Sequence, residues 1–303
     1  MPTDFTPAEL QERIRNNPND ADAWSKIGFL LLIEGKSKEA KAMLERAVAL
    51  DPKNFEAWAG LGVIAANKGA LKESEELYKQ SVKIQSNFSD GWFALARIYW
   101  GQAKYKDAEK ALKKCSFETL EKRVMVLREL ALVYMMWNKF ADAEKTVKQA
   151  IQLDPTNTEL KIILHRALKG QKSRDKENQA ALAYREIPFG TMNLEELLTA
   201  LGQAMQLGDF EVAEDFGRRI RDIDSRNIDG LFIQHRHLTD RYNYHYASMC
   251  SSTRTSQDGW QVKKLDEEIK KLDKTIRSVI DSDPSAKMRW QALFNRYPYN
   301  RHF

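Results

Sequence analysis

Apolar and polar residues in the first half of the chain alternate with a helical period, because residues three or four apart lie on the same face of a helix. Residues 20–54 hold two successive stripes of small or apolar side chains: Trp24, Ile27, Gly28 and Leu31, then Ala40, Leu44 and Ala47. Asp51-Pro52 follows, and Pro does not continue a helix. The pattern predicts two amphipathic helices joined by a turn.

The same unit recurs along the chain at a fixed interval. Trp24, Trp58 and Trp92 stand 34 residues apart, and Leu127 holds the fourth place after one extra residue near Arg123. Small residues recur in the same register on both helices of each unit: Gly28, Gly62, Ala96 and Ala131 on the first, and Ala40, Ser74, Ala108 and Ala143 on the second. Helix axes approach to about 8–10 Å where small side chains meet, so the pattern predicts closely packed helix pairs.

This order of residues resembles the tetratricopeptide repeat, a helix, a turn and an antiparallel helix. The resemblance implies an all-α fold, a right-handed α-α superhelix made of antiparallel helix pairs. It covers four units of the sequence, at residues 21–54, 55–88, 89–122 and 124–157. In this family the first helix of each pair lines a concave surface that holds a peptide or a partner helix. The resemblance therefore implies a scaffold for protein binding, without naming the partner.

The sequence suggests four parts in order. They are an N-terminal capping helix in 1–20, a repeat array over 21–168 that includes one further helix, a charged connection with a short helix over 169–190, and a degenerate helical region over 191–303. Thr6-Pro7-Ala8-Glu9 has the form of a capping box and predicts the first helix. Turns are expected at or close to Gly35, Gly69 and Gly101, and the charged connection is a candidate hinge.

The repeat returns in weaker form after the charged connection. Gly208 to Ala213 overlays Gly35 to Ala40, which predicts a degenerate repeat over 194–227 with Leu197 in place of Trp. A long hairpin is expected over 228–282, with its loop at Cys250 to Gly259. A terminal half repeat over 285–298 carries Trp290 in register with a preceding Asp-Pro.

The residues expected on the inner face of the first helices are mostly apolar. They are Phe29, Leu32, Ile33, Val63, Asn67, Phe93, Arg97, Trp100, Arg128, Leu132, Met135 and Met136. An apolar surface with adaptable Met side chains suits an amphipathic helix or an extended segment, and Arg97 and Arg128 can hold a carboxylate. Burial against the chain's own next turn explains the same periodicity, so the pattern leaves both interpretations open.

The family's best-defined binding mode grips the C-terminal carboxylate of heat-shock chaperones with Lys, Asn and Arg side chains. The matching places in this sequence hold Ser25, Phe29, Gly60, Asp90 and Ala94. We therefore expect this carboxylate clamp to be absent.

A narrow apolar seam runs along the last long helix: Val262, Leu265, Ile269, Leu272, Ile276 and Val279. Such a seam can dock on a partner surface. It could occupy the binding face of the same chain as self-inhibition, or of a second copy in self-association through 260–282. The interpretation favoured by its length of about 2.5 heptads is that it closes its own helical region.

A second interpretation of function rests on a basic and aromatic stretch from His235 to Tyr246. Aromatic rings and cations together serve single-stranded nucleic acid such as RNA. On a helix, however, Leu231, Leu238, Tyr242 and Met249 form a buried stripe, and the remaining Tyr side chains are expected at its edge. With 48 basic and 43 acidic residues overall, nucleic-acid binding is the less favoured interpretation.

Catalytic and metal-binding motifs are not recognisable in the sequence. It has no phosphate-binding Gly-rich loop and no nucleophile elbow, and no His pair has the spacing of a shared metal ion. We expect a non-catalytic protein without cofactors. Cys115 and Cys250 do not suggest a disulfide framework, and the start of the chain lacks a basic stretch followed by an apolar one. These features favour a cytoplasmic protein that does not contact a membrane.

Overall fold

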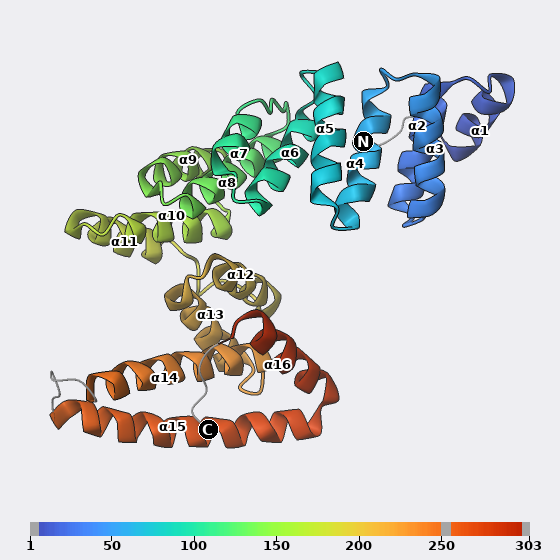
Figure 1. Cartoon of the computed structure of the whole chain (residues 1–303). Helices are drawn as coiled ribbons and strands as arrows, with labels where there is room; N and C mark the ends of the chain where they lie inside the picture. Colours follow the sequence, from blue (N-terminus) through green and yellow to red (C-terminus); the bar gives the residue numbers. More distant parts are fainter. Residues whose placement is uncertain (1–5, 250–255, 299–303) are drawn as a thin grey trace. The chain divides into compact units, whose positions relative to one another are not determined.

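The computed structural model describes residues 6–249 and 256–298, whose regular elements are all α-helices (Figure 1). Contacts between Cα atoms divide the chain into two compact units, residues 1–155 and residues 156–303, and each unit is described by itself. Within the described residues, none of the helices combines the length and the apolar character that crossing a bilayer requires.

The first unit contains nine of the described helices. They are α1 (Pro7–Asn16), α2 (Ala21–Ile33), α3 (Ser37–Leu50), α4 (Phe55–Asn67), α5 (Leu71–Ile84), α6 (Ser89–Gly101), α7 (Tyr105–Leu112), α8 (Leu120–Met136) and α9 (Phe140–Leu153). The capping box predicted at the start is present, because Thr6 and Glu9 bond each other's side chain and backbone. The predicted helix pairs are α2 with α3, α4 with α5, α6 with α7, and α8 with α9.

The small residues lie where the helices of a pair approach each other. A Cβ atom added to Gly28 would stand 2.6 Å from Leu44 Cγ, so only glycine fits between α2 and α3 at this point. In the next pair the Ser74 hydroxyl donates a 2.8 Å hydrogen bond to the Gly62 carbonyl. This bond satisfies a hydroxyl that the close approach has buried. The predicted close packing is therefore present in the structure.

The turn inside each repeat contains one residue in the left-handed conformation. This residue is Gly35 (φ 76°), Gly69 (φ 75°), Ala103 (φ 56°) and Asn138 (φ 57°) in successive repeats. The third turn was expected at or close to Gly101, which is the last residue of α6, and the left-handed residue lies two positions further on. Ala103 stands 34 residues after Gly69, so the left-handed residue keeps the register although its residue type changes.

The three evenly spaced indoles occupy equivalent environments. Each is half-buried and donates its N–H to the backbone carbonyl six residues earlier: Trp24 to Pro18 at 2.9 Å, Trp58 to Pro52 at 2.9 Å and Trp92 to Ser86 at 2.8 Å. Each indole thus fixes the loop that leads into its own helix.

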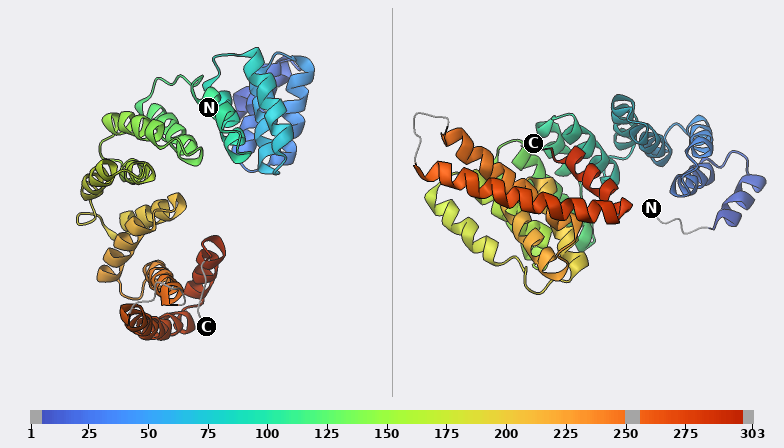
Figure 2. Two further views of the ribbon diagram at one scale, coloured as in Figure 1. Left: turned by 60° about the vertical axis from the view of Figure 1, so that its left-hand side comes forward. Right: turned by 90° about the horizontal axis from the view of Figure 1, so that it is seen from below.

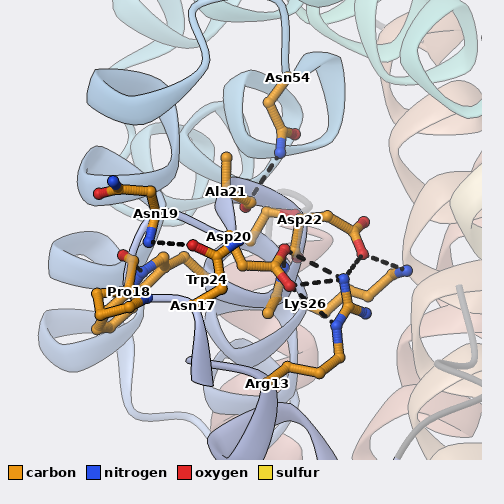
Figure 3. A network of polar contacts seen from close by, with 12 residues as sticks. Arg13, Asn17, Pro18, Asn19, Asp20, Ala21, Asp22, Trp24, Lys26 and Asn54 are labelled. Atoms are coloured by element: carbon orange, nitrogen blue, oxygen red, sulfur yellow. Dashed lines mark hydrogen bonds and ion pairs between the residues drawn. The ribbon is translucent and has the colours of Figure 1, made fainter. Parts of the chain in front are cut away.

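A polar network joins the first repeat to its neighbours (Figure 3). The Arg13 guanidinium on α1 donates to Asp20 at 3.0 Å and to Asp22 at 2.9 Å. Asp20 also caps α2, and the Asn54 amide donates to the Ala21 carbonyl at 3.2 Å. These bonds hold α1 and the start of α4 to the N-terminal end of α2.

The third repeat ends irregularly. Helix α7 has 8 residues, whereas α3, α5 and α9, which hold the same place in their repeats, have 14 each. Residues 113–119 then form a connection without α-helix (Figure 2), and α8 begins early and reaches 17 residues. An altered joint was expected near Arg123, and the structure departs from the regular pair just before it, at residues 113–119 and at the early start of α8.

The second unit contains the remaining described helices. They are α10 (Thr158–Gly170), α11 (Arg174–Arg185), α12 (Leu194–Leu207), α13 (Phe210–Ile223), α14 (Ile228–Met249), α15 (Ser256–Ser282) and α16 (Pro284–Arg296). Helix α10, which the sequence analysis placed at the end of the first array, belongs to this unit. Part of the loop expected at Cys250 to Gly259 lies outside the described residues, and α15 begins at Ser256, before that loop was expected to end.

One hydrophobic core runs through the second unit from Ile162 to Leu293. Helices α12 and α13 pack as a pair where the degenerate repeat is expected, with Gly208 left-handed at the turn (φ 69°) and Leu197 buried. The seam residues of α15 from Leu265 to Val279 are buried in this same core. The seam therefore packs within its own unit, as the interpretation favoured by its length predicted.

Candidate functional site

The inner side of the first helices of the first unit is the candidate site, and we call it the first-helix face. It consists of the residues predicted from the sequence on α2, α4, α6 and α8: Phe29, Leu32, Ile33, Val63, Asn67, Phe93, Arg97, Trp100, Arg128, Leu132, Met135 and Met136. Their exposure to solvent differs widely, which divides the face into an outer and an inner part.

The outer part lies at the C-terminal ends of the helices. Ile33 is 76% exposed, Trp100 43% and Met136 55%, and Asn67 is exposed at the matching end of α4. Ile33, Asn67 and Met136 are the last residues of their helices, and Trp100 is the last but one in α6. Three large apolar side chains thus reach solvent at the C-terminal ends of three first helices. Ile33 and Met136 hold the same register position, and Trp100 stands one position earlier.

The inner part of the face is integrated into the repeats themselves. Phe29, Leu32, Val63, Phe93 and Leu132 are half-buried. Met135 is only 8% exposed, so it is a core residue of the fourth repeat and not a contact available to a partner. Helical periodicity does not separate the two groups, because the same period runs through both.

The two cations of the face differ in availability. Arg97 is exposed, and within the described parts of the chain no ion pair or hydrogen bond holds its guanidinium. Arg128 is half-buried, and its guanidinium lies 2.5 Å from the Glu129 carboxylate. Arg97 is therefore the residue of the face that can meet a carboxylate on a binding partner.

A pocket of about 410 Å³ that the sequence analysis did not predict lies at the irregular third joint. Residues of the connection, of α8 and of α9 line it, among them Cys115, Phe117, Arg123 and Leu127. Two signals in the sequence indicate its location. The Asp-Pro ending is missing from the third repeat, and Leu127 stands in the Trp series.

The basic and aromatic stretch on α14 does not form a continuous cationic surface. His235 is buried against Asp273 on α15 at 3.1 Å, and His237 lies 2.7 Å from Glu214. The Arg236 guanidinium stacks over the Phe210 ring at 3.8 Å. Tyr244, by contrast, is 73% exposed and is not packed at the helix edge as expected.

The described residues contain no cluster of three or more His, Cys, Asp or Glu side chains suited to hold a metal ion. The Cys115 thiol is also unsuited to act as a nucleophile, because burial raises its pKa to about 12 and leaves it protonated near neutral pH.

Comparison with known proteins identifies repeats in the first unit. Two models described as tetratricopeptide repeat match residues 30–87 and 89–116. A search of curated proteins returned no match.

Solved structures share the fold. The C-terminal part of a repeat-containing protein from Cytophaga hutchinsonii aligns with a TM-score of 0.55 at 17% identity, covering 74% of this chain and 92% of that one. YrrB aligns with a TM-score of 0.53 at 16% identity, covering 60% and 92%. The structure reported for Pseudomonas aeruginosa pilF aligns with a TM-score of 0.50 at 22% identity, covering 71% and 96%. The matched residues and the packed helix pairs together show that the first unit contains tetratricopeptide repeats.

Proposed function

We propose that the protein is a non-catalytic scaffold that binds an apolar or amphipathic protein segment on the first-helix face. The observation that carries this proposal is the set of exposed apolar side chains Ile33, Trp100 and Met136 near the C-terminal ends of three first helices. Large apolar side chains exposed on successive repeats are typical of interaction surfaces, because their burial by a partner is favourable.

The side chains of the first-helix face indicate which kinds of residue the partner presents. Trp100 offers a broad amphipathic ring and Met136 an adaptable thioether, so the partner supplies apolar side chains without demanding one fixed shape. Of the two cations on the first-helix face, Arg97 is the one without an ion pair or hydrogen bond to a described side chain. We therefore expect the partner to carry a carboxylate beside its own apolar residues. An amphipathic helix with an acidic residue next to its apolar stripe fulfils both conditions.

Peptide binding on this fold has a parallel among the structural relatives, since YrrB is described as a TPR protein with an unusual peptide-binding site. We place this chain in the same broad role, as an adaptor in the cytoplasm. The relative shares the fold at low identity, so the residues proposed for binding come from this chain alone.

A pull-down from cell extract with and without nuclease tests the class of partner. We expect a protein that remains bound after nuclease treatment and is lost when Phe93→Ala and Trp100→Ala are combined. Recovery that disappears with nuclease would support the RNA interpretation, which rests on the exposed Tyr244 of α14.

A further inference from the structure

The pocket at the third joint has an apolar floor and a polar rim. Cys115, Phe117, Val126, Leu127 and Leu153 line it and are half-buried, while Arg123, Gln149 and Gln152 line it and are exposed. The side chains come from the 113–119 connection, from α8 and from the last turns of α9. This arrangement lies within the first unit and does not use any residue of the first-helix face.

The repeats themselves indicate what such a place holds. Leu127 stands in the register where Trp24, Trp58 and Trp92 stand in the first three repeats. In those repeats a half-buried indole fills the space beside the incoming loop and bonds to its backbone. In the fourth repeat a smaller side chain stands at this position, and a pocket of about 410 Å³ lies beside it.

The backbone around Leu127 also differs. In the regular repeats the carbonyl six residues before the Trp belongs to a loop and accepts the indole N–H. Six residues before Leu127 is Glu121, which lies inside α8 because that helix begins early, at Leu120. The early start and the shortened α7 open the joint, and neither Cys115 nor Phe117 of the connection closes it.

We propose that this pocket binds an aromatic side chain, best an indole, presented by a partner protein next to an acidic residue. The apolar floor buries the ring, and the Gln149 and Gln152 side-chain carbonyls at the rim can accept an indole N–H. The Arg123 guanidinium has no ion pair or hydrogen bond among the residues that the structure describes, so it is available for a neighbouring carboxylate.

The contact is noncovalent. Cys115 is the only nucleophile among the lining residues, and its thiol donates weak hydrogen bonds of 3.5 Å to the carbonyls of Ser89 and Ala111. These contacts and its half-buried position keep it a packing group in the wall of the pocket.

Methyl NMR of the full-length protein tests the proposal with small probes. N-acetyl-tryptophanamide is titrated at millimolar concentration, and the methyl signals of Val126 and Leu153 report on the pocket. We expect shifts confined to these signals, and binding about three- to tenfold weaker for N-acetyl-leucinamide, which lacks the ring. The Leu127→Trp variant restores the side chain of the other repeats and should abolish the shifts.

The charged rim is tested separately. An acetylated aspartyl-tryptophanamide should bind the Arg123→Gln variant about two- to fivefold more weakly than the native protein, whereas the alanyl-tryptophanamide should bind both equally. Arg123 is exposed, so this variant keeps the fold even if Leu127→Trp disturbs it.

Three results would overturn the proposal. They are methyl shifts scattered over the protein, equal binding of the leucine and tryptophan probes, and unchanged binding to a folded Leu127→Trp variant. A native dimer that becomes a monomer on Leu127→Trp would also overturn it, because the occupant would then be a second copy of the chain.

Discussion

Lys104 donates a hydrogen bond of 3.2 Å to the Glu75 carboxylate, which joins the second repeat to the turn of the third. Glu75 lies on α5 and is nearly buried, and Lys79 on the same helix lies 2.7 Å from its other oxygen. Burial opposes the ionisation of Glu75, but hydrogen bonds from Lys79, Gln102 and Lys104 together lower its pKa. The ionised carboxylate is therefore part of the contact between repeats.

The lowered pKa predicts a pH dependence. A carboxyl group whose pKa is lower in the folded state stabilises above the unfolded value of 4.5, and this contribution is lost as the pH falls through the folded value. We expect Glu75→Gln to reduce the free energy of unfolding by about 1 kcal/mol at pH 7. Thermal unfolding followed by circular dichroism should show this difference shrinking below about pH 4.5. A difference that stays constant down to pH 3 would contradict the assignment.

A second prediction rests on the close packing of α2 against α3. In Gly28→Ala the new Cβ would lie 2.6 Å and 2.8 Å from Cγ and Cδ2 of Leu44, which is fully buried and cannot move aside freely. We expect a loss of about 1–3 kcal/mol in chemical denaturation. Gly101→Ala is the matched control, because nothing lies within 4 Å of its Cβ position, and it should be neutral or stabilising by up to about 1 kcal/mol. Equal losses in both variants would refute the close packing.

The third turn predicts a stabilising substitution. Ala103 has a φ of 56°, a conformation that costs a residue with a Cβ atom roughly 1 kcal/mol or more. Ala103→Gly should therefore raise the free energy of unfolding by about 0.5–1 kcal/mol after the greater entropy of the unfolded chain is counted. Gly35→Ala, at the matching turn with a φ of 76°, should change stability in the opposite direction. Changes of the same sign would contradict the equivalence of the turns.

The thiol in the pocket wall predicts slow chemical labelling. Burial raises the pKa of Cys115 to about 12, so the reactive thiolate is scarce at pH 8. In a Cys250→Ser protein we expect the native form to react with a thiol reagent at least about tenfold more slowly than the unfolded form. Labelling at the same rate in both forms would show that the pocket wall is open to solvent.

The fold could be predicted from the sequence because the 34-residue spacing sets the helix-to-helix contacts of several repeats at once. A Trp in the register of Trp24 and a small residue in the register of Gly28 recur in the first three repeats in the same relation to a second helix. Such a pattern has one way to bury its small and apolar faces. The overlay of Gly208 on Gly35 worked for the same reason, since both residues are left-handed at their turns. The register carried this information better than residue type did, as Ala103 shows.

The candidate site was less predictable. Met135 and Met136 are neighbours on one helix, yet the first is buried and the second 55% exposed. Periodicity assigned both to one face, because the difference depends on how far the paired helix covers the end of α8. The pocket beside Leu127 depends on where α7 ends and α8 begins. Predicting it requires the path of the backbone through the 113–119 connection, which helical periodicity does not give.

The most direct test of the account measures the affinity of the captured partner for two matched triple variants by calorimetry. The first combines Ile33→Ala, Trp100→Ala and Met136→Ala, and the second removes exposed apolar side chains elsewhere through Leu71→Ala, Leu182→Ala and Ile223→Ala. The account predicts at least about a tenfold loss of affinity in the first variant and less than about a twofold change in the second. Equal losses in both variants, or a loss in the second alone, would contradict binding on the first-helix face.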